Sequence, residues 1–440
     1  MPQKKNSKNQ LLLQAPKGMR DILPDEAPYW ERVKKSLKEI AGFYNFDFID
    51  TPILERADLF TRGIGLSTDI VEKEMYILKT KGGDRLALRP EFTAPVMRAY
   101  IEHGMSRLPQ PVKLYYFGSV FRHESPQAGR LREFHQVGFE IMGGETDPIY
   151  DAQIILAAVR FLEELKIKNF IVRVNSIGCK ICRPVFRKKL QDYYKKQLSS
   201  AKKKKIICKD CERRLATNPL RLLDCKNELC VLLKEQAPGI LDSLCANCRS
   251  HFKGVLEFLD EVAVPYALDP CLVRGLDYYN RTVFEIFEET GNLALAAGGR
   301  YDYLAEFLGE KPIPAVGVAP GVERIIEILK AKTEDKEKEV LERKLKDRLF
   351  VVHVGEVAKK KALVLIENLR RSNVRVAEAL GKDSLQAQLK MADKKGAVLA
   401  LIIGQKEVYE ESVIMRDMVS GLQETVPIKK IIEVMKKRLG

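Results

Sequence analysis

Apolar and polar residues alternate along two neighbouring stretches in the first half of the chain. The first stretch, Lys113 to Arg122, is rich in aromatic and β-branched residues. In the second, Phe134 to Met142, alternate positions place Gln136 and Glu140 on one face. A turn-rich segment, 125–130, separates them. The pattern predicts strand, loop and strand, with polar groups on one face of a sheet.

Other segments show the spacing of helices or strands. Apolar positions at helical spacing predict helices, and β-branched runs predict strands. Pro52 lacks a backbone donor, so its strand is expected at a sheet edge or subunit interface, and a polar loop is expected at Thr61–Met75. The predicted helices are Pro28–Tyr44, Val96–His103 and Ile149–Leu165, and the further strands are Phe46–Glu55, Phe170–Asn175 and a short strand that ends within Leu86–Pro95.

A charged segment and an alternating segment end the chain. Ala331–Arg348 is almost entirely charged, which indicates an exposed linker, assigned to residues 331–347. After it, strands alternate with helices, which predicts a small α/β domain. Its predicted strands are Leu349–Val354, Val374–Ala377, Ala397–Ile403 and Val413–Arg416, and its helices are Ala358–Ser372, Leu385–Lys395 and Ile428–Leu439.

The composition indicates a soluble protein with a polyanionic partner. The 440 residues include 75 Lys plus Arg against 60 Asp plus Glu, a formal charge of +15. Such an excess favours nucleic acid, although lysine-rich surfaces also serve solubility and thermal adaptation. No apolar run reaches membrane-spanning length, and residues 1–15, read as a disordered basic tail, lack the apolar core of a secretory signal. We expect a cytoplasmic protein without a membrane partner.

Arginines gather around the predicted polar face. Arg122 ends the first strand, and Arg130 and Arg132 lie between the two strands, so three guanidiniums could converge above the sheet. Arg274 precedes a glycine turn and Arg324 lies in the first turns of a predicted helix, and both are further candidates. Guanidinium groups match phosphate oxygens. The alternative is an antiparallel hairpin with a charged tip.

A carboxylate and a hydroxyl lie in the segment Leu86–Pro95, where a short strand ends and a helix starts. Glu91 and Thr93 occupy that junction. A carboxylate at a helix start commonly serves as a cap or dipole partner. Because the polar face is predicted nearby, a role in binding is the competing interpretation.

Eight of the nine cysteines fall in four close pairs between residues 179 and 248. Three pairs have the two-residue gap that lets both thiolates face one cation, so the pairs could complete one or two structural Zn²⁺ sites. Free buried cysteines are the alternative, and disulfides are disfavoured in a reducing cytosol. Lys202–Lys205, a lysine run inside this region, is either a solvated loop or a contact to a nucleic-acid backbone. The cysteine pairs are Cys179/Cys182, Cys208/Cys211, Cys225/Cys230 and Cys245/Cys248.

Several of these segments resemble one enzyme family. Phe121–Glu124 with its loop resembles motif 2 of class II aminoacyl-tRNA synthetases, Gly317–Arg324 resembles motif 3, and the Pro52 strand with its preceding helix resembles motif 1. Leu272–Tyr279 and Ala297–Asp302 resemble the signatures specific to histidyl-tRNA synthetases. From residue 16 to its end the chain resembles that family.

The resemblance implies an α+β catalytic domain built on an antiparallel sheet, over residues 16–330. It also implies a small inserted domain, which carries the cysteines at 176–255, and a C-terminal α/β anticodon-binding domain at 348–440. The implied reaction joins L-histidine to ATP as histidyl-adenylate and transfers it to the 3′ end of tRNA(His), with Mg²⁺ bridging the phosphates. A homodimer is implied as well.

The resemblance also assigns roles to individual residues. Arg122 and Arg274 would be the catalytic groups, holding the α-phosphate and contacting histidine. Arg130 would contact the γ-phosphate, Arg324 the bent ATP, and Glu124 would lie near the adenine. The remaining histidine-binding residues would be Glu91, Thr93 and Gln136 at the α-amino group and Glu140, Tyr278 and Tyr279 at the imidazole.

This chain departs from the family pattern at one position, because Phe92 stands where glycine is common. The zinc hypothesis rests on cysteine spacing alone, since many family members have no cysteines in the insert. Two other functions compete with the synthetase. One is a catalytically silent histidine sensor of the ATP phosphoribosyltransferase regulatory-subunit type, which usually lacks the anticodon domain. The other is a nucleic-acid-binding protein without ATP turnover.

Overall fold

Two units, Met1–Lys332 and Thr333–Gly440, make up the computed structural model. The structure describes residues 13–65, 68, 70–124, 130–200, 206–289, 294–332 and 349–439. The tip of the predicted hairpin at 125–129, the lysine run at 202–205 and the linker at 333–348 lie outside these residues. Each unit is described by itself.

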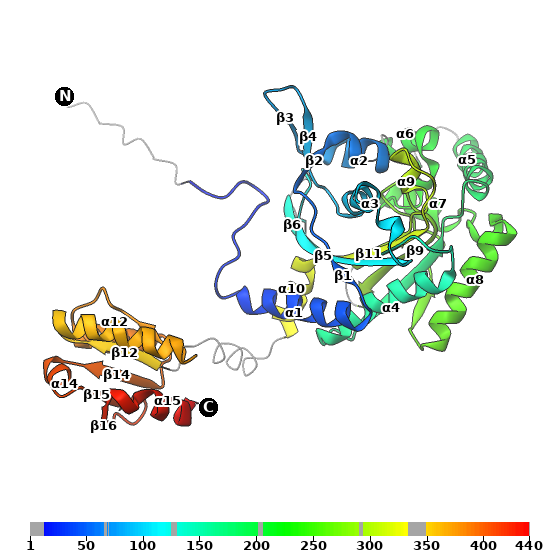
Figure 1. Ribbon diagram of the computed structural model, residues 1–440. Helices are drawn as coiled ribbons and strands as arrows, with labels where there is room; N and C mark the ends of the chain where they lie inside the picture. The colour runs from blue at the N-terminus through cyan, green and yellow to red at the C-terminus, as the bar shows by residue number, and fades with distance from the viewer. Residues whose placement is uncertain are drawn as a thin grey trace, which may run out of the picture. The chain divides into compact units, whose positions relative to one another are not determined.

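An eight-stranded sheet forms the centre of the first unit, in the order β1-β5-β6-β11-β10-β9-β7-β8. Neighbouring strands are antiparallel except for the parallel pairs β1–β5 and β7–β8 (Figure 1). The predicted antiparallel catalytic sheet is thereby confirmed. The strands are β1 Asp47–Phe48, β5 Val112–Phe121, β6 Glu133–Met142, β7 Phe170–Ser176, β8 Tyr266–Leu268, β9 Asn280–Glu288, β10 Ala294–Arg300 and β11 Ala315–Pro320.

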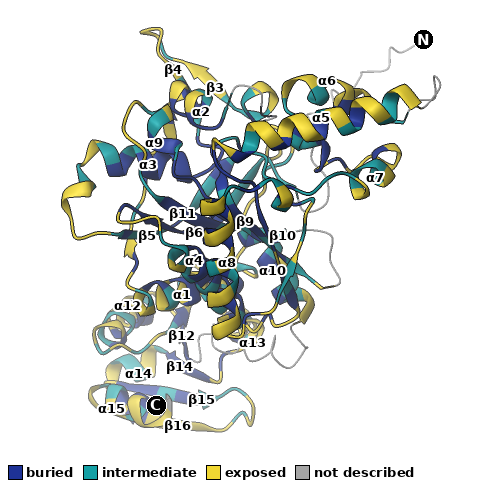
Figure 2. Cartoon of the chain, turned by 90° about the vertical axis from the view of Figure 1, so that its right-hand side faces the viewer, coloured by how far each residue is buried: buried dark blue, intermediate teal, exposed yellow. Residues whose placement is uncertain are grey.

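Helices cover both faces of this sheet (Figure 1). On one face, α1 (Ala27–Phe43), α4 (Pro148–Glu164), α8 (Ala246–Glu261) and α10 (Val322–Lys332) bury their apolar stripes in a shared core. On the other face lie α2 (Ala57–Gly63), α3 (Thr93–Glu102), α9 (Leu304–Phe307) and the insert. The insert contains α5 Cys182–Ser200, α6 Lys209–Thr217 and α7 Glu228–Glu235. Its outer surface is exposed, whereas its cysteines share the core beneath (Figure 2).

The segment around Pro52 differs from its prediction. The single strand expected at Phe46–Glu55 is divided into β1 and β2 (Leu54–Arg56), because the chain leaves the large sheet at the proline. β2 belongs to a three-stranded sheet, β2-β4-β3, with β3 at Ile77–Lys79 and β4 at Arg85–Leu88. The prediction of a loop at Thr61–Met75 was wrong in part, since α2 ends inside this segment and Ile70–Glu74 forms a π-helical turn.

The second unit is a five-stranded sheet in the order β13-β12-β14-β15-β16. Its first three strands are parallel and the last two are antiparallel, so the predicted α/β character is confirmed. Sequence reasoning missed the short helix α14 and the edge strand β16. The strands are Ala377–Glu378, Leu349–His353, Leu399–Ile403, Ser412–Asp417 and Gln423–Pro427 in sheet order, and the helices are α12 Glu356–Arg371, α13 Leu385–Lys394, α14 Gln405–Tyr409 and α15 Ile431–Leu439.

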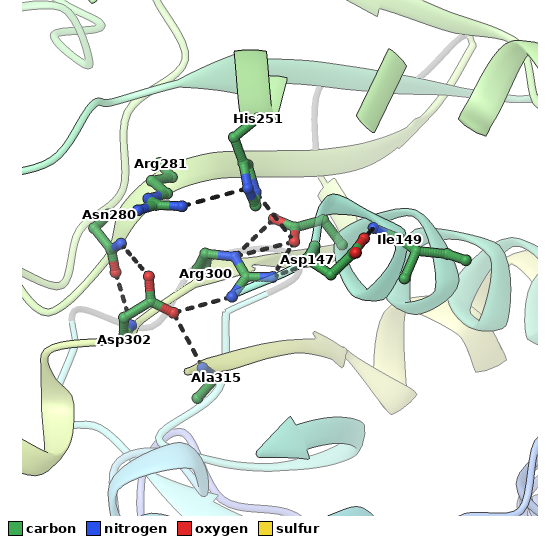
Figure 3. Close-up of polar contacts among 9 residues, drawn as sticks. Asp147, Ile149, His251, Asn280, Arg281, Arg300, Asp302 and Ala315 are labelled. Atoms are coloured by element: carbon green, nitrogen blue, oxygen red, sulfur yellow. Dashed lines mark hydrogen bonds and ion pairs between the residues drawn. The ribbon is translucent and has the colours of Figure 1, made fainter. Parts of the chain in front are cut away.

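A buried ion network ties α4 to the centre of the large sheet (Figure 3). Arg300, 1% exposed at the end of β10, donates to both carboxylate oxygens of Asp151 and, at 3.0 Å, to Asp302. Asp302 also accepts from Asn280 at 2.8 Å and from the Ala315 amide at 3.1 Å. Although burial acts to raise the pKa of Asp151, Arg300 and His251 outweigh it and hold that pKa below its usual value. The motif residues Arg300 and Asp302 therefore position strands.

We predict that Asp151→Ala lowers the free energy of unfolding of this unit by about 3 to 5 kcal/mol, because it leaves the Arg300 guanidinium buried without its main counter-charge. Thermal and urea denaturation measure the change. The control is Glu39→Ala, which removes an exposed partner of Lys35 and should change stability by less than about 1 kcal/mol. An Asp151→Ala protein as stable as the control would contradict this account.

Candidate active site

A cavity of about 600 Å³ opens on the face of the large sheet that carries α3 and the insert. Strands β5, β6, β10 and β11, the start of α3 and the loop before β9 contribute its walls. Of the residues predicted to bind ATP or histidine, Glu140 alone is absent from the lining, because it is completely buried behind the wall. The lining includes Glu91, Thr93, Arg122, Glu124, Arg130, Gln136, Arg274, Tyr278, Tyr279 and Arg324.

Glu140 lies on β6 and is completely buried. One of its carboxyl oxygens accepts from the Thr93 hydroxyl at 2.9 Å and from the Tyr116 hydroxyl at 3.2 Å. The other accepts from the Tyr301 hydroxyl at 2.5 Å. Burial raises the pKa of Glu140 to about 8, against the smaller opposing effect of these hydroxyl donors. A carboxyl group that is held in one orientation thus lies behind the inner wall of the cavity, next to Thr93.

Two glycines make room for this group. A Cβ atom on Gly317, which pairs with Glu140 across β11 and β6, would lie 1.5 Å from the Glu140 Oε2 atom. A Cβ atom on Gly138 would lie 2.1 Å from the ring of Tyr116. Neither position can carry a side chain while Glu140 and Tyr116 keep their places.

Glu91 has two kinds of contact. It accepts from the backbone amides of Thr93 at 2.7 Å and Ala94 at 3.0 Å, so it caps the start of α3, as the simpler interpretation expects. It also accepts from the Tyr278 hydroxyl at 3.3 Å and lines the cavity. Burial is the main cause that raises the pKa of Glu91 above its usual value. The cap fixes a carboxylate that the cavity presents to a ligand.

Gln136 offers an acceptor to the cavity. Its side chain, 9% exposed on β6, lines the cavity together with Glu91. Within the described residues, its Oε1 atom is buried and has no hydrogen-bond partner. Buried acceptors are normally satisfied, so a ligand with an N–H group would complete this one.

Phe92 fills the space beneath α3. Its ring stacks on Tyr116 with centroids 4.2 Å apart, and the Arg89 guanidinium lies 3.9 Å above the ring. Gly118 allows this arrangement, because a Cβ atom there would lie 2.8 Å from Phe92. The backbone of Phe92 has φ of −103°, a conformation open to any residue. The departure from glycine therefore requires no backbone strain beside Glu91.

Arginines from three elements gather at the outer part of the cavity. Arg122 follows β5, where its Nε donates to the Pro90 carbonyl at 2.9 Å. Arg324 lies in the first turn of α10 and donates to the Ala294 carbonyl at 2.6 Å. Burial and then the charges of Arg130 and Arg122 lower the pKa of Arg324. Like charges held this close favour an anion between them. Arg132 does not join them, because it donates to the carbonyls of Glu124 and Lys17.

Arg274 lines the cavity beside the tyrosines. It donates to Glu285 at 2.5 Å, and its guanidinium lies 5.2 Å from the Tyr279 ring centroid. Burial acts to lower the pKa of Arg274, but Tyr279 and Glu285 outweigh it and raise that pKa above its usual value. Tyr278 and Tyr279 are both buried, with ring centroids 4.6 Å apart. The wall thus combines one fixed cation with two aromatic hydroxyl groups.

Sequence reasoning missed several residues of the site. Tyr116 and Tyr301 hold Glu140, Glu285 pairs with Arg274, and Arg20 lines the cavity. Tyr301 lies in the Ala297–Asp302 motif, but nothing in the sequence shows that its hydroxyl faces β6. The alternation along β9 places Glu285 on the same face as Val283 and Phe287, which gave no signal for a cavity residue.

A second cavity, of about 870 Å³, lies beside the first. The two share six residues in their walls, including Arg130, Glu285 and Arg324. Cations outnumber carboxylates in the second cavity: the insert contributes Lys209, Arg214, Arg221, Lys226 and Lys234 and β7 contributes Arg173, against Asp210, Asp224, Asp269 and Glu285.

The eight paired cysteines assemble into two groups. Cys179, Cys182, Cys245 and Cys248 form one group, and Cys208, Cys211, Cys225 and Cys230 form the other. Within each group the sulfur atoms all lie within 4.8 Å of one another. The ninth cysteine, Cys271, belongs to neither group. None of the nine, all within the described ranges, is in a disulfide.

Comparison with known protein families gives two matches that together span most of the chain. The family model described as "Histidyl-tRNA synthetase" matches residues 18–325, and one described as "Anticodon binding domain" matches residues 348–438. Across the part of the chain that the structure describes, no helix is long and apolar enough to cross a membrane.

Similar proteins and structures carry the same name. A "Histidine--tRNA ligase" of Dehalococcoides mccartyi is 42% identical over 97% of this chain and 100% of its own length. One from Thermodesulfovibrio yellowstonii is 42% identical over 96% and 98%. The crystal structure of apo Staphylococcus aureus histidyl-tRNA synthetase, 31% identical, has a TM-score of 0.76 and covers 97% of this chain and 100% of its own.

We predict that Gly317→Ala abolishes ligand recognition at the inner end of the cavity, because the new methyl group would occupy the place of the Glu140 carboxyl. Binding of amino acids to the variant, measured by calorimetry, should be lost. Gly42→Ala is the control, since a Cβ atom at Gly42 has no other atom within 4 Å. Unchanged binding by Gly317→Ala would show that Glu140 has no part in recognition.

The raised pKa of Glu140 predicts a pH dependence of stability. In the folded protein the Glu140 carboxyl keeps its proton up to a pKa of about 8, whereas its usual pKa is 4.5. The stability that this protonated carboxyl contributes is therefore fully present below pH 4.5. It is lost as the pH rises through 8, at no more than about 1.4 kcal/mol per pH unit. The melting temperature of the ligand-free protein should therefore fall more steeply between pH 4.5 and pH 8 than that of Glu140→Gln. Parallel curves would contradict the assignment.

Proposed function

Because this chain belongs to the histidyl-tRNA synthetase family, we propose that it activates L-histidine with ATP and transfers the product to the 3′ end of tRNA(His). The observation that carries the proposal is a single cavity that joins two recognition chemistries. A fixed carboxyl group and its hydroxyl donors lie behind the inner wall, and arginines close enough to repel one another line the outer part.

The inner end is suited to a histidine side chain. A neutral imidazole has one N–H donor and one acceptor nitrogen. Glu140 would accept from the ring, and Tyr279 would complete its hydrogen bonds, with Tyr278 packed beside them. Amino acids without ring nitrogens would leave these buried groups unpaired, which is the stronger form of discrimination.

The α-amino group of histidine would lie at the start of α3. The carboxylate of Glu91, the Thr93 hydroxyl and the unpartnered Oε1 atom of Gln136 all lie at that end of the cavity. Acceptors of this kind suit an ammonium group. The amino acid would then direct its own carboxylate towards the arginines.

Activation requires no nucleophile from the protein. A carboxylate oxygen of histidine bonds to the α-phosphorus of ATP, the bond from that phosphorus to the bridging oxygen breaks, and pyrophosphate leaves. Arg122 and Arg274, which both line the cavity, would hold the α-phosphate and balance the charge that builds up on it, as well as contacting histidine. Their effect is greatest where the bound substrates exclude water.

The remaining nucleotide contacts follow the same geometry. Arg130 would bind the γ-phosphate and Arg324 the bent ATP, while Glu124 would lie near the adenine. Mg²⁺ would supply further charge neutralisation at the phosphates, and Glu285 in the cavity wall would offer it an oxygen ligand. Zn²⁺ in the insert would be structural and would take no part in the reaction.

Transfer requires the 3′ end of the tRNA to reach the adenylate. A ribose hydroxyl attacks the histidyl carbonyl, and AMP leaves. The basic cavity next to the active site supports this step, because its lysines and arginines can contact phosphates of a single strand. The second unit would bind the anticodon.

We include a homodimer and a cytoplasmic location in the proposal. β1 is the edge strand of the large sheet, and apolar side chains around it are exposed. Phe43 is 77% exposed, Phe48 59% and Ile53 49%. Such a surface is suited to pairing with a second copy.

The experiment that tests the proposal is ATP–pyrophosphate exchange without tRNA, run with L-histidine and with each other amino acid. Exchange with histidine alone is the expected result. Histidine binding without exchange would favour the histidine sensor, and a silent protein that binds RNA in a salt-sensitive way would favour the nucleic-acid-binding alternative.

We predict that Arg274→Ala lowers the histidine-dependent exchange rate by about 100-fold or more, because it removes charge stabilisation at the reacting phosphate. Steady-state exchange kinetics measure the effect. The matched control is Arg160→Ala, which also removes an arginine paired with a glutamate at 2.5 Å, but on the exposed face of α4. Equal rates for the two variants would reject the role of Arg274.

A further inference from the structure

The insert is held by eight thiols whose arrangement the proposed reaction does not use. They lie in two separate groups of four, and six of the eight are buried. Small buried cysteines commonly serve as apolar packing residues. Three observations favour metal binding over packing here.

The first observation is the spacing of the sulfur atoms. The sulfur atoms lie 3.7 Å apart in Cys179 and Cys182, 3.9 Å apart in Cys179 and Cys245, and 3.8 Å apart in Cys208 and Cys225. Sulfurs bound tetrahedrally to one zinc ion at about 2.3 Å lie about 3.8 Å apart. A disulfide would need about 2.05 Å. The groups therefore have the dimensions of a four-sulfur zinc site.

The second observation is that backbone amides point at the sulfurs. In the first group, the amides of Ile181 and Cys245 donate to Cys179 at 3.4 Å and to Cys182 at 3.1 Å. In the second, the amides of Cys208 and Asn227 donate to Cys230 at 3.3 Å and to Cys225 at 3.5 Å. Amide donors favour the thiolate form, which is the form that binds metal.

The third observation is the position of the thiols on helices. Cys182 begins α5, Cys208 and Cys245 precede α6 and α8, and Cys211, Cys230 and Cys248 lie in first turns. The partial positive charge of a helix start favours thiolates. Two zinc-bound groups with four thiolates each would carry excess negative charge, and these helix starts would offset it.

We propose that the insert binds two structural Zn²⁺ ions, one at Cys179, Cys182, Cys245 and Cys248 and the other at Cys208, Cys211, Cys225 and Cys230. The first ion joins the loop after β7 to the starts of α5 and α8, so it closes the insert at its base, where the chain leaves the catalytic sheet and returns to it. The second ion lies within the insert and holds the start of α6 against α7. This inference does not depend on the chemistry of the active site.

The closure at the base has a structural consequence for the cavity. Arg183, next to Cys182, donates to the backbone carbonyls of Tyr279 and, at 3.5 Å, Asp277. Asn218, which lies between the cysteines of the second group, donates to the Asp277 carboxylate at 3.0 Å. The zinc-bound insert thereby supports the loop that carries the cavity tyrosines.

The test is the zinc content of the untagged full-length protein, produced in zinc-supplemented medium and measured by mass spectrometry of the metal. Two zinc ions per chain are expected for the wild type and for Cys271→Ser, the cysteine outside both groups. Cys208→Ser should retain one ion. Fewer than two ions in the wild type, or equal loss in Cys271→Ser and Cys208→Ser, would overturn the proposal.

Two measurements on the wild-type chain keep the test decisive if Cys208→Ser fails to fold. Titration with a mercurial reagent should release both ions as the thiols react, which a metal-sensitive dye records. Replacement by Co²⁺ should give the visible absorption of a tetrahedral thiolate complex. Thiols that react without releasing metal, or a cobalt spectrum typical of six-coordinate oxygen ligands, would contradict the assignment.

Discussion

The carboxyl group of Glu140 is the constraint on which the candidate site depends. Its oxygens accept hydrogen bonds from Thr93, Tyr116 and Tyr301, and its place exists because Gly317 has no side chain. These contacts join α3, β5, β6, β11 and the turn after β10, which are far apart in sequence. A buried carboxyl group without such donors would be costly. The antiparallel order of the sheet is what brings the donors to it.

A second constraint opposes stability. Arg122, Arg130 and Arg324 face one another closely enough that burial and mutual repulsion lower the pKa of Arg324. The fold tolerates this repulsion because other contacts hold each arginine: Pro90 holds Arg122, Glu124 holds Arg130, and Ala294 holds Arg324. A polyanion would relieve it without any change of fold. Arginines placed in advance of the ligand are what phosphoryl chemistry needs, since the protein contributes orientation and charge.

Local patterns predicted the parts of the structure that depend on local physics. Alternation identified β5 and β6, and helical spacing identified α1 and α4 to within a few residues. The convergence of Arg122, Arg130 and Arg324 followed from strand ends and a helix start, whereas the prediction for Arg132 was wrong, because its guanidinium donates to the carbonyls of Glu124 and Lys17 instead. Tertiary partners gave no sequence signal. The hydroxyl of Tyr301 and the assignment of cysteine pairs to groups depend on contacts across more than 60 residues of chain.

The Arg300 network illustrates the same limit. The Gly-Gly-Arg-Tyr-Asp segment resembles a substrate signature, yet Arg300 and Asp302 are buried in ion pairs and hydrogen bonds that hold β10, α4 and β9 together. Tyr301, between them, points to the other side and reaches Glu140. One motif therefore serves stability and the site at once. Alternation along an extended segment explains the division, because neighbouring side chains face opposite ways.

The most direct test of the central claim is the affinity of the protein for L-histidine, measured by calorimetry for the wild type and for Glu140→Gln. The amide keeps the size of the side chain, and a matching thermal melt shows whether the variant is folded. If Glu140 recognises the imidazole by a hydrogen bond, the variant should bind histidine at least about 100-fold more weakly. The ring would then lose a hydrogen bond to a carboxyl group in a buried site. A folded variant with wild-type affinity would contradict the account and leave Glu140 as a packing residue.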